Sequence, residues 1–229
     1  MQTTADVLAQ LEADGTEQNR KIYQRHGSGL LLYGVSYANL NTFKKRVKVN
    51  HDIAKDLWET GNHDARIFAL MIADPKQADD DLLENWAQNL DNYMVAGAFA
   101  GYVGNTAFAH EKMLQWTQSD DEWIGAVGWD LLGHLAMKDK SLDNSFFQSY
   151  LPIIERDIHS RKNRTRYSMN NALIAIGIRN DDLEEAATAA AQQIGVVTVD
   201  HGKTSCKTPD AAPYIQKTNA RRRKKAKAR

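Results

Sequence analysis

Residues 82–103 read LLENWAQNLDNYMVAGAFAGYV, and this stretch decides the fold class. Each half places a large apolar residue at every fourth position, first from Leu82 and then from Val95. This recurrence puts the apolar side chains on one face of an α-helix, which must be buried against a neighbour. Asn92 stands between the two patterns, and its short polar side chain is suited to capping the second helix. The stretch therefore predicts two short helices joined by a tight turn.

The same rhythm continues along the chain. Further apolar stripes comprise Trp123, Val127, Leu131 and Leu135; Phe147, Leu151, Ile154 and Ile158; and Leu183, Ala187, Ala190 and Ile194. Residues suited to capping recur between the stripes: Ser36, Asn50 or His51, Asn62, Asp79, Asn92, Asn105 or Thr106, Ser119 or Asp120, Asn144 and Asp181. Two such helices with their turns span about 26–40 residues, the scale of HEAT-type units. We therefore predict an all-α, HEAT-like helical-repeat solenoid of stacked antiparallel helix pairs. An ordinary helical bundle is the alternative, because no sequence repeat is evident.

The pattern predicts one domain with two distinct C-terminal parts. Residues 1–217 form the predicted HEAT-like domain. Within it, residues 196–217 form a short capping segment packed on the last helix pair, beginning with a β-prone run and a turn. A short final helix is expected near Thr208 as N-cap, with Pro209 at its first position. Residues 218–229 form a basic tail that we expect to be disordered.

Charge is unevenly distributed along the chain. The 29 basic and 29 acidic residues balance formally, but residues 218–229 hold seven of the basic residues and no acid. The remaining chain carries 22 basic and 29 acidic residues, a net charge of −7. The cationic tail suits a polyanion such as nucleic acid. A solvated terminus that maintains solubility is an equal alternative.

Several classes of protein and site are not favoured by the sequence. The longest nearly apolar run is about half of what spans a bilayer, and the N-terminus lacks the form of a signal peptide, so we expect a cytoplasmic protein. The single cysteine, Cys206, excludes an internal disulfide. The seven histidines form no pair at i, i+4 and no HExxH motif, so no metal site is expected. No P-loop or GxGxxG motif points to a cofactor.

Three groups of basic residues are candidates for phosphate contacts, because Lys and Arg neutralise phosphates regardless of base sequence. The alternative for each group is a solvated face with local ion pairs. The candidate DNA-binding residues are Lys44, Lys45 and Lys48; Arg161, Lys162, Arg164 and Arg166; and Lys203 and Lys207.

Several stretches resemble one family of proteins. They are Tyr33-Gly34-Val35-Ser36 with the following Phe43-Lys44-Lys45; Asp56-Leu57-Trp58 leading to His63-Asp64-Ala65-Arg66; Ser119 to Trp123; Met169 to Gly177; and Val199 to Ala211. Together they resemble the DNA alkylation repair family of HEAT-like repeat proteins, over about residues 15–217. The resemblance implies a scaffold that cradles duplex DNA, and in the best-known members it implies an alkylpurine DNA glycosylase.

The chain departs from this family where catalysis occurs. Active members use an Asp near tryptophans to stabilise the cation that develops as the N-glycosidic bond breaks. The matching position here is Ala96, the family's catalytic-site Arg falls near Ala126, and a second aromatic falls near Leu173. Asp91 is a weak candidate for a relocated carboxylate, with capping of the next helix as its alternative role. Trp129 and Asp130 are a second candidate, as an aromatic–carboxylate pair, and a packing tryptophan beside an exposed aspartate explains them equally well.

Three hypotheses follow. The preferred one is a protein that binds duplex or branched DNA through backbone charge and shape, without standard alkylpurine glycosylase chemistry. The second is an active glycosylase with relocated catalytic residues, which would hydrolyse the N-glycosidic bond of alkylated purines. The third is a helical scaffold for a protein partner.

Overall fold

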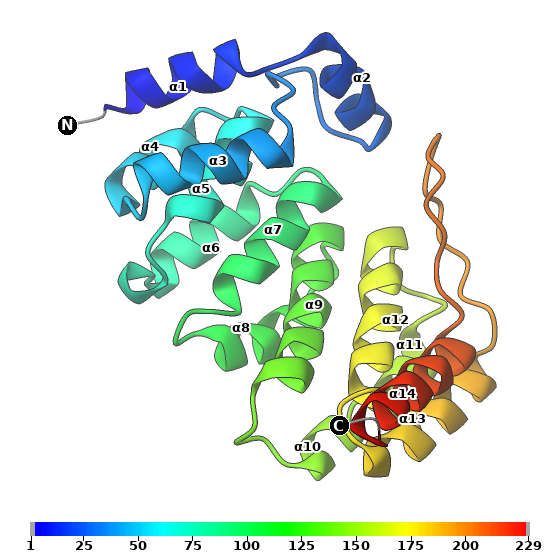
Figure 1. Ribbon diagram of the computed structural model, residues 1–229. Helices are drawn as coiled ribbons and strands as arrows, with labels where there is room; N and C mark the ends of the chain where they lie inside the picture. The colour runs from blue at the N-terminus through cyan, green and yellow to red at the C-terminus, as the bar shows by residue number, and fades with distance from the viewer. Residues whose placement is uncertain (1–2, 228–229) are drawn as a thin grey trace. The chain divides into compact units, whose positions relative to one another are not determined.

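The computed structural model describes residues 3–227, which form helices and no β-strand; the longest loop between helices covers residues 195–210 (Figure 1). The predicted all-α class is confirmed. The chain separates into two compact units, and each is described by itself. The first unit runs up to Phe108 and also includes His201–Ser205. Its helices are α1 (Thr4–Ala13), α2 (Glu17–Arg25), α3 (Tyr37–Val47), α4 (His51–Glu59), α5 (His63–Ile72), the short 3-10 helix η1 (Pro75–Gln77), α6 (Asp80–Gln88) and α7 (Tyr93–Val103).

The second unit contains Ala109–Asp200 and the chain from Cys206 onward. Its helices are α8 (Ala109–Trp116), α9 (Glu122–Lys138), α10 (Asn144–Gln148), α11 (Leu151–Asp157), α12 (Asn163–Gly177), α13 (Asp181–Ile194) and α14 (Ala211–Lys227). None of the helices of residues 3–227 is both long and apolar enough to cross a membrane.

Helix starts are fixed by side-chain caps, many of them at the predicted residues. The caps at Ser36, Asn50, Asn62, Asp79 and Asn92 each accept a hydrogen bond from the first turn of the helix that follows. Other helix starts were displaced from the prediction by one or two residues. The caps there are Asp121, Asp143 and Asn180 rather than Ser119 or Asp120, Asn144 and Asp181.

Aromatic stacking and close helix approach build the two cores. In the first unit Trp58 stacks on Trp86 with ring centroids 4.7 Å apart, and both side chains are buried. In the second unit α9 packs along α12 and α8. Gly128 lies so close to the backbone between α8 and α9 that an added Cβ would be 2.4 Å from the Thr117 nitrogen. The predicted stripes on α7, α9, α11 and α13 supply buried residues to these cores.

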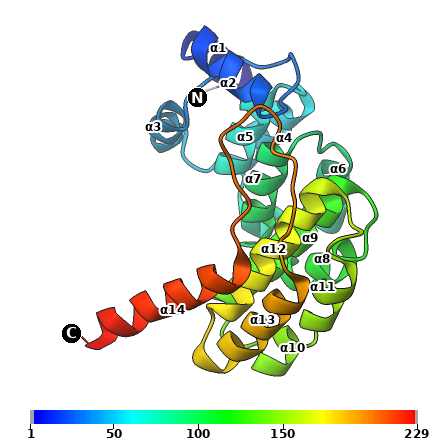
Figure 2. The same cartoon turned by 90° about the vertical axis from the view of Figure 1, so that its right-hand side faces the viewer.

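The C-terminal segment differs from the prediction in three ways. Residues 196–199 form no strand, and His201–Ser205 belong to the first unit rather than to a cap on the last helix pair. The last helix begins at Ala211, two residues beyond Pro209. Most important, α14 continues through the segment expected to be a disordered tail, as far as Lys227 (Figure 2). The last two residues of that predicted tail, 228–229, lie outside the described residues.

Candidate nucleic-acid interface

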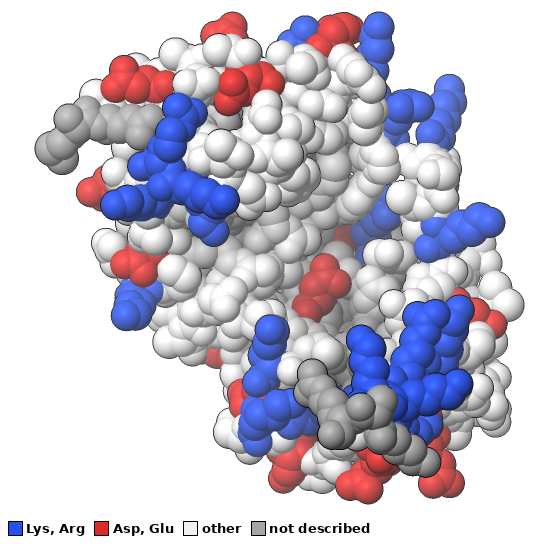
Figure 3. Space-filling view, in the orientation of Figure 1, with Lys and Arg blue, Asp and Glu red and all other residues white. Residues whose placement is uncertain are grey.

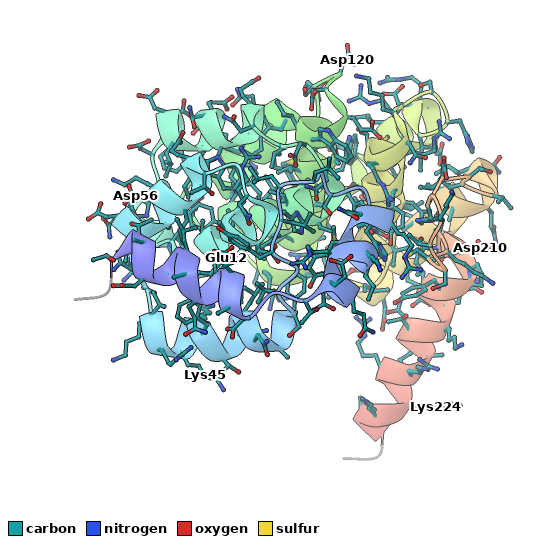
Figure 4. All side chains as sticks on the ribbon, turned by 90° about the horizontal axis from the view of Figure 1, so that it is seen from above. Glu12, Lys45, Asp56, Asp120, Asp210 and Lys224 are labelled. Atoms are coloured by element: carbon teal, nitrogen blue, oxygen red, sulfur yellow. The ribbon has the colours of Figure 1, made fainter. Side chains whose placement is uncertain are left out.

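The first predicted basic group lies at the C-terminal end of α3. Lys44 and Lys45 are in its last turn and Lys48 follows as the C-cap, with a φ of 62°. All three side chains are exposed, and Lys45 points away from the helices of its unit (Figure 4). Cations at this end of a helix also interact favourably with the helix dipole. The group is therefore accessible to phosphate.

Two arginines of the second predicted group bond to other residues of the protein. Arg161, whose side chain is 20% exposed, donates to the carbonyl oxygens of Thr117 (3.1 Å) and Ser119 (2.6 Å), and its Nη1 lies 3.1 Å from Asp120 Oδ1. These bonds tie the start of α12 to the turn between α8 and α9. The sequence did not indicate this use of Arg161.

Arg166 is also bonded to backbone within the second unit. It donates to the carbonyl oxygens of Thr198 (2.8 Å) and Arg161 (3.0 Å). The half-buried Arg164 receives support at its backbone, where its N–H donates to Glu122 Oε1 (2.7 Å). Lys162 is the exposed member of this group and precedes the first residue of α12. Of the four predicted residues, Lys162 is the one placed most openly for a phosphate.

Lys203 and Lys207 fall in different units. Lys203 lines a cleft of about 790 Å³ in the first unit, together with Gln18, Lys21, Ile22, Gln24 and Arg25 of α2. Lys21 is partly balanced by Glu17, with Nζ 3.6 Å from Oε1. Lys21 and Arg25, the two cations of α2 that line this cleft, were not predicted from sequence, although their i, i+4 spacing places them on one helix face. Lys207 is exposed in the second unit.

Asp91, the weak candidate for a relocated carboxylate, is exposed and bonded to its neighbours. Its side chain is 57% exposed, with Oδ2 3.7 Å from Arg66 Nη1, and its Oδ1 accepts a hydrogen bond from Asn92 Nδ2 at 2.7 Å. The cap of α7 is Asn92, so the alternative role of Asp91 as a helix cap is wrong. The nearby Ala96 is buried within α7 and offers only a methyl group.

The second unit contains a carboxylate that the sequence placed beside Trp129 without indicating its surroundings. Ala126 on α9 and Leu173 on α12 are buried, as their apolar side chains require. One turn beyond Ala126, burial raises the pKa of Asp130 to about 6, although a hydrogen bond with Ser168 on α12 opposes this shift. Asp130 is therefore not the exposed aspartate expected from the sequence. Its burial was not predicted because part of its environment comes from α12, which is distant in sequence.

A polar cluster in the first unit organises the loop before α3. The buried carboxylate of Asp64 accepts three backbone hydrogen bonds, from Tyr33 (2.7 Å), Gly34 (2.9 Å) and Val35 (2.8 Å). The Tyr23 hydroxyl donates to the Val35 carbonyl at 2.7 Å, and burial, helped by the charge of Asp64, raises the Tyr23 pKa to about 12. These residues hold the loop in place. In residues 3–227 no three His, Cys, Asp or Glu side chains gather closely enough to hold a metal ion.

Comparison with known proteins gives the family of this chain. Residues 7–215 match the model of a family described as DNA alkylation repair enzyme. The chain belongs to the DNA alkylation repair family. The resemblance inferred from sequence is thereby confirmed over nearly the whole chain.

Two curated proteins that are similar to this chain carry the name uncharacterized protein. Uncharacterized protein Lin0241 of Listeria innocua is 32% identical over 226 residues, covering 95% of this chain and 98% of its own length. Uncharacterized protein Lmo0209 of Listeria monocytogenes is 31% identical with the same coverage.

A solved structure is also similar to this DNA alkylation repair family member. That protein is described as a new family of proteins related to the HEAT-like repeat DNA glycosylases with affinity for branched DNA structures. It is 30% identical, with a TM-score of 0.87, and the match covers 97% of this chain and 96% of the other. The HEAT-like architecture predicted from helix rhythm is thereby confirmed.

Proposed function

We propose that this DNA alkylation repair family member binds DNA through its phosphate backbone, with preference for branched forms, and lacks the standard glycosylase chemistry. The observation that carries the proposal is the whole-length similarity to a solved protein with affinity for branched DNA.

Exposed cations supply the binding energy in this proposal. Lys44, Lys45 and Lys48 in one unit and Lys162 and Lys207 in the other are exposed. Contacts between such side chains and DNA phosphates position a protein on DNA without specifying the base sequence. Preference for a branched form then comes from the geometry of the duplex arms rather than from base contacts.

The lack of standard chemistry rests on three residues. A glycosidic bond that breaks through a cationic transition state needs a nearby carboxylate. Ala96, Ala126 and Leu173 supply only apolar groups at the positions matched to the family's catalytic residues. Loss of one well-placed electrostatic group typically costs about a hundredfold or more in rate.

The test compares binding of the full chain to a four-way junction, a fork, a linear duplex and a single strand of equal nucleotide length. We expect the junction and the fork to bind more tightly than the duplex, with affinity falling steeply as salt rises. Equal affinity for all four DNAs would remove the preference for branching. No binding to any of them at low salt would refute the proposal.

A glycosylase with a relocated carboxylate is the second candidate, favoured by Asp130. A carboxyl group with a pKa of about 6 in a water-poor site is a common feature of general acids and charge stabilisers. In this candidate, wild type releases methylated purines from alkylated DNA, Asp130→Asn abolishes release and Asp91→Asn leaves it intact. If wild type releases no base, this candidate is ruled out.

A further inference from the structure

Helix α14 has one face committed to its own unit. Ala211, Ala212, Ile215 and Asn219 are buried, and Asn219 Nδ2 donates to the Gly177 carbonyl oxygen at 2.9 Å. With 3.6 residues per turn, these positions share one side of the helix. The first half of α14 is therefore fixed against the end of α12 and against α13.

Two arginines extend this attachment into the highly basic part of the helix. Arg222 Nη1 donates to the Ile178 carbonyl oxygen at 2.6 Å, and Arg222 Nη2 lies 3.0 Å from Asp181 Oδ1. Arg223 bonds both carboxylate oxygens of Glu184, at 2.6 and 3.1 Å. Asp181 and Glu184 belong to the acidic first turn of α13. The contacts with this turn involve Arg222 and Arg223, and they fix the direction of the rest of α14.

The opposite face of α14 carries a row of cations. Lys217, Arg221, Lys224 and Lys225 stand at positions i, i+4, i+7 and i+8, within an arc of about 100° on a helical wheel. All four are exposed and form no ion pair with another described residue. We call these four residues the cationic row.

The cationic row lies where a large partner can reach it. The C-terminal half of α14 extends beyond the other helices of its unit, and Lys224 lies on this part (Figures 2 and 4). Lys and Arg side chains gather where the helix ends, at the lower right of Figure 3. The row is therefore open to solvent along its length.

The geometry of the cationic row fits a duplex phosphate backbone. Eight residues of helix rise span about 12 Å, and a duplex carries about seven phosphate charges over the same axial length. A membrane surface is the competing polyanion. Helices that lie in a membrane surface need large apolar residues along one face, such as Trp, Phe or Leu. The exposed part of α14 beyond Asn219 contains no uncharged residue other than Ala220 and Ala226.

We propose that the cationic row of α14, oriented by the Arg222 and Arg223 contacts with α13, is a docking surface for the phosphate backbone of a DNA duplex. It is a contact additional to the basic groups described above. The inference rests on the proposed function, because it assigns this surface to the same partner.

The test measures the affinity of the full chain for a four-way junction, and its slope against salt concentration, in three forms of the protein. The row variant carries Lys217→Gln, Arg221→Gln, Lys224→Gln and Lys225→Gln. A matched control removes the same charge at four exposed lysines elsewhere, through Lys55→Gln, Lys76→Gln, Lys138→Gln and Lys140→Gln. Circular dichroism and melting temperature establish that each variant is folded.

We expect the row variant to lose at least tenfold in affinity at low salt and to lower the salt slope by about two to four, because each phosphate contact contributes about 0.9. The control should change affinity by less than threefold. Equal affinity and slope in the row variant and the control would overturn the inference while leaving the proposed function intact. Absence of binding by wild type would instead refute the proposed function.

Two further measurements complete the test. Acetylation of Lys217, Lys224 and Lys225 in wild type should slow when the junction is bound, and unchanged acetylation would count against the row without relying on any variant. Vesicles containing phosphatidylserine provide the membrane arm. If the row variant loses vesicle binding but keeps DNA binding, the surface is a membrane contact and the inference is wrong.

Discussion

Arg223 and Glu184 form a two-pronged ion pair, with Nη1 2.6 Å from Oε2 and Nη2 3.1 Å from Oε1. The Glu184 side chain is only 16% exposed, so the pair is shielded more than an ordinary surface pair. Planar, paired geometry of this kind is the strongest form of an Arg–carboxylate contact. The pair attaches the basic part of α14 to the first turn of α13.

The first prediction concerns the order of α14. Glu184→Gln removes the acceptor charge, which we expect to lower the local stability of residues 220–226 by about 1 kcal/mol. Amide hydrogen exchange of this segment, measured by mass spectrometry, should then accelerate roughly fivefold. Glu185→Gln, on the same helix, is the control and should leave exchange unchanged. Equal exchange in both variants would show that the pair does not order the helix.

The second prediction separates the two uses of basic residues at α12. Arg161→Gln breaks contacts with two carbonyl oxygens and a carboxylate, so we expect the free energy of unfolding to fall by about 2 kcal/mol. DNA affinity, measured where the variant is fully folded, should change by less than threefold. Lys162→Gln should do the reverse, with unchanged stability and weaker DNA binding. A stable Arg161→Gln variant with lost DNA affinity would contradict this division.

The third prediction concerns pH. The folded pKa of Asp130, about 6, lies above that of the unfolded chain, so the folded protein binds more protons between about pH 4 and pH 6. The stability that the protonated Asp130 carboxyl gives the folded protein is present below pH 4, and it is lost as the pH rises through 6. Asp130→Asn should therefore raise stability at pH 7 by about 1 to 3 kcal/mol, at 1.4 kcal/mol per unit of pKa.

Chemical denaturation at pH 4.5 and pH 7.5 checks this expectation. The gain from Asp130→Asn should be larger at pH 7.5. A larger gain at pH 4.5, or an NMR titration of Asp130 near pH 4, would contradict the assignment.

The fourth prediction compares two helical glycines. An added Cβ at Gly128 would lie 2.4 Å from backbone atoms of Trp116 and Thr117, so Gly128→Ala should destabilise the protein by at least about 2 kcal/mol. Gly97 on α7 has no such neighbour within 4 Å, and Gly97→Ala should stabilise by about 0.5 to 1 kcal/mol. Thermal unfolding of both variants should give melting temperatures that shift in opposite directions. Similar shifts would mean that α8 and α9 can separate at little cost.

The features predictable from sequence are those determined within one turn of a helix. The caps at Ser36 and Asn62 could be identified because the capping oxygen and the amides it binds are two or three residues apart. The cap of α10 was predicted at Asn144 and lies at Asp143. Both side chains are suited to capping, and only the backbone conformation decides which of them caps the helix.

The site was less predictable because its contacts join distant parts of the chain. Arg161 and the carbonyls that it binds are 42 and 44 residues apart, and Arg223 and Glu184 are 39 apart. A run of basic residues has the same sequence appearance whether its charges face solvent or bind neighbouring backbone. The predicted disorder of residues 218–227 was wrong for this reason, and the burial of Asp130 likewise depends on α12, distant in sequence.

The stacked pair of Trp58 and Trp86 gives the first unit a spectroscopic signature of its own. Two indoles with ring centroids 4.7 Å apart are close enough for their electronic transitions to couple, and where the two transition moments are skewed the coupling gives a paired positive and negative band in circular dichroism. Trp116, Trp123 and Trp129 are in the second unit and are not stacked on another tryptophan among the described residues. One sample can therefore report whether the two units melt together or in sequence, without any label.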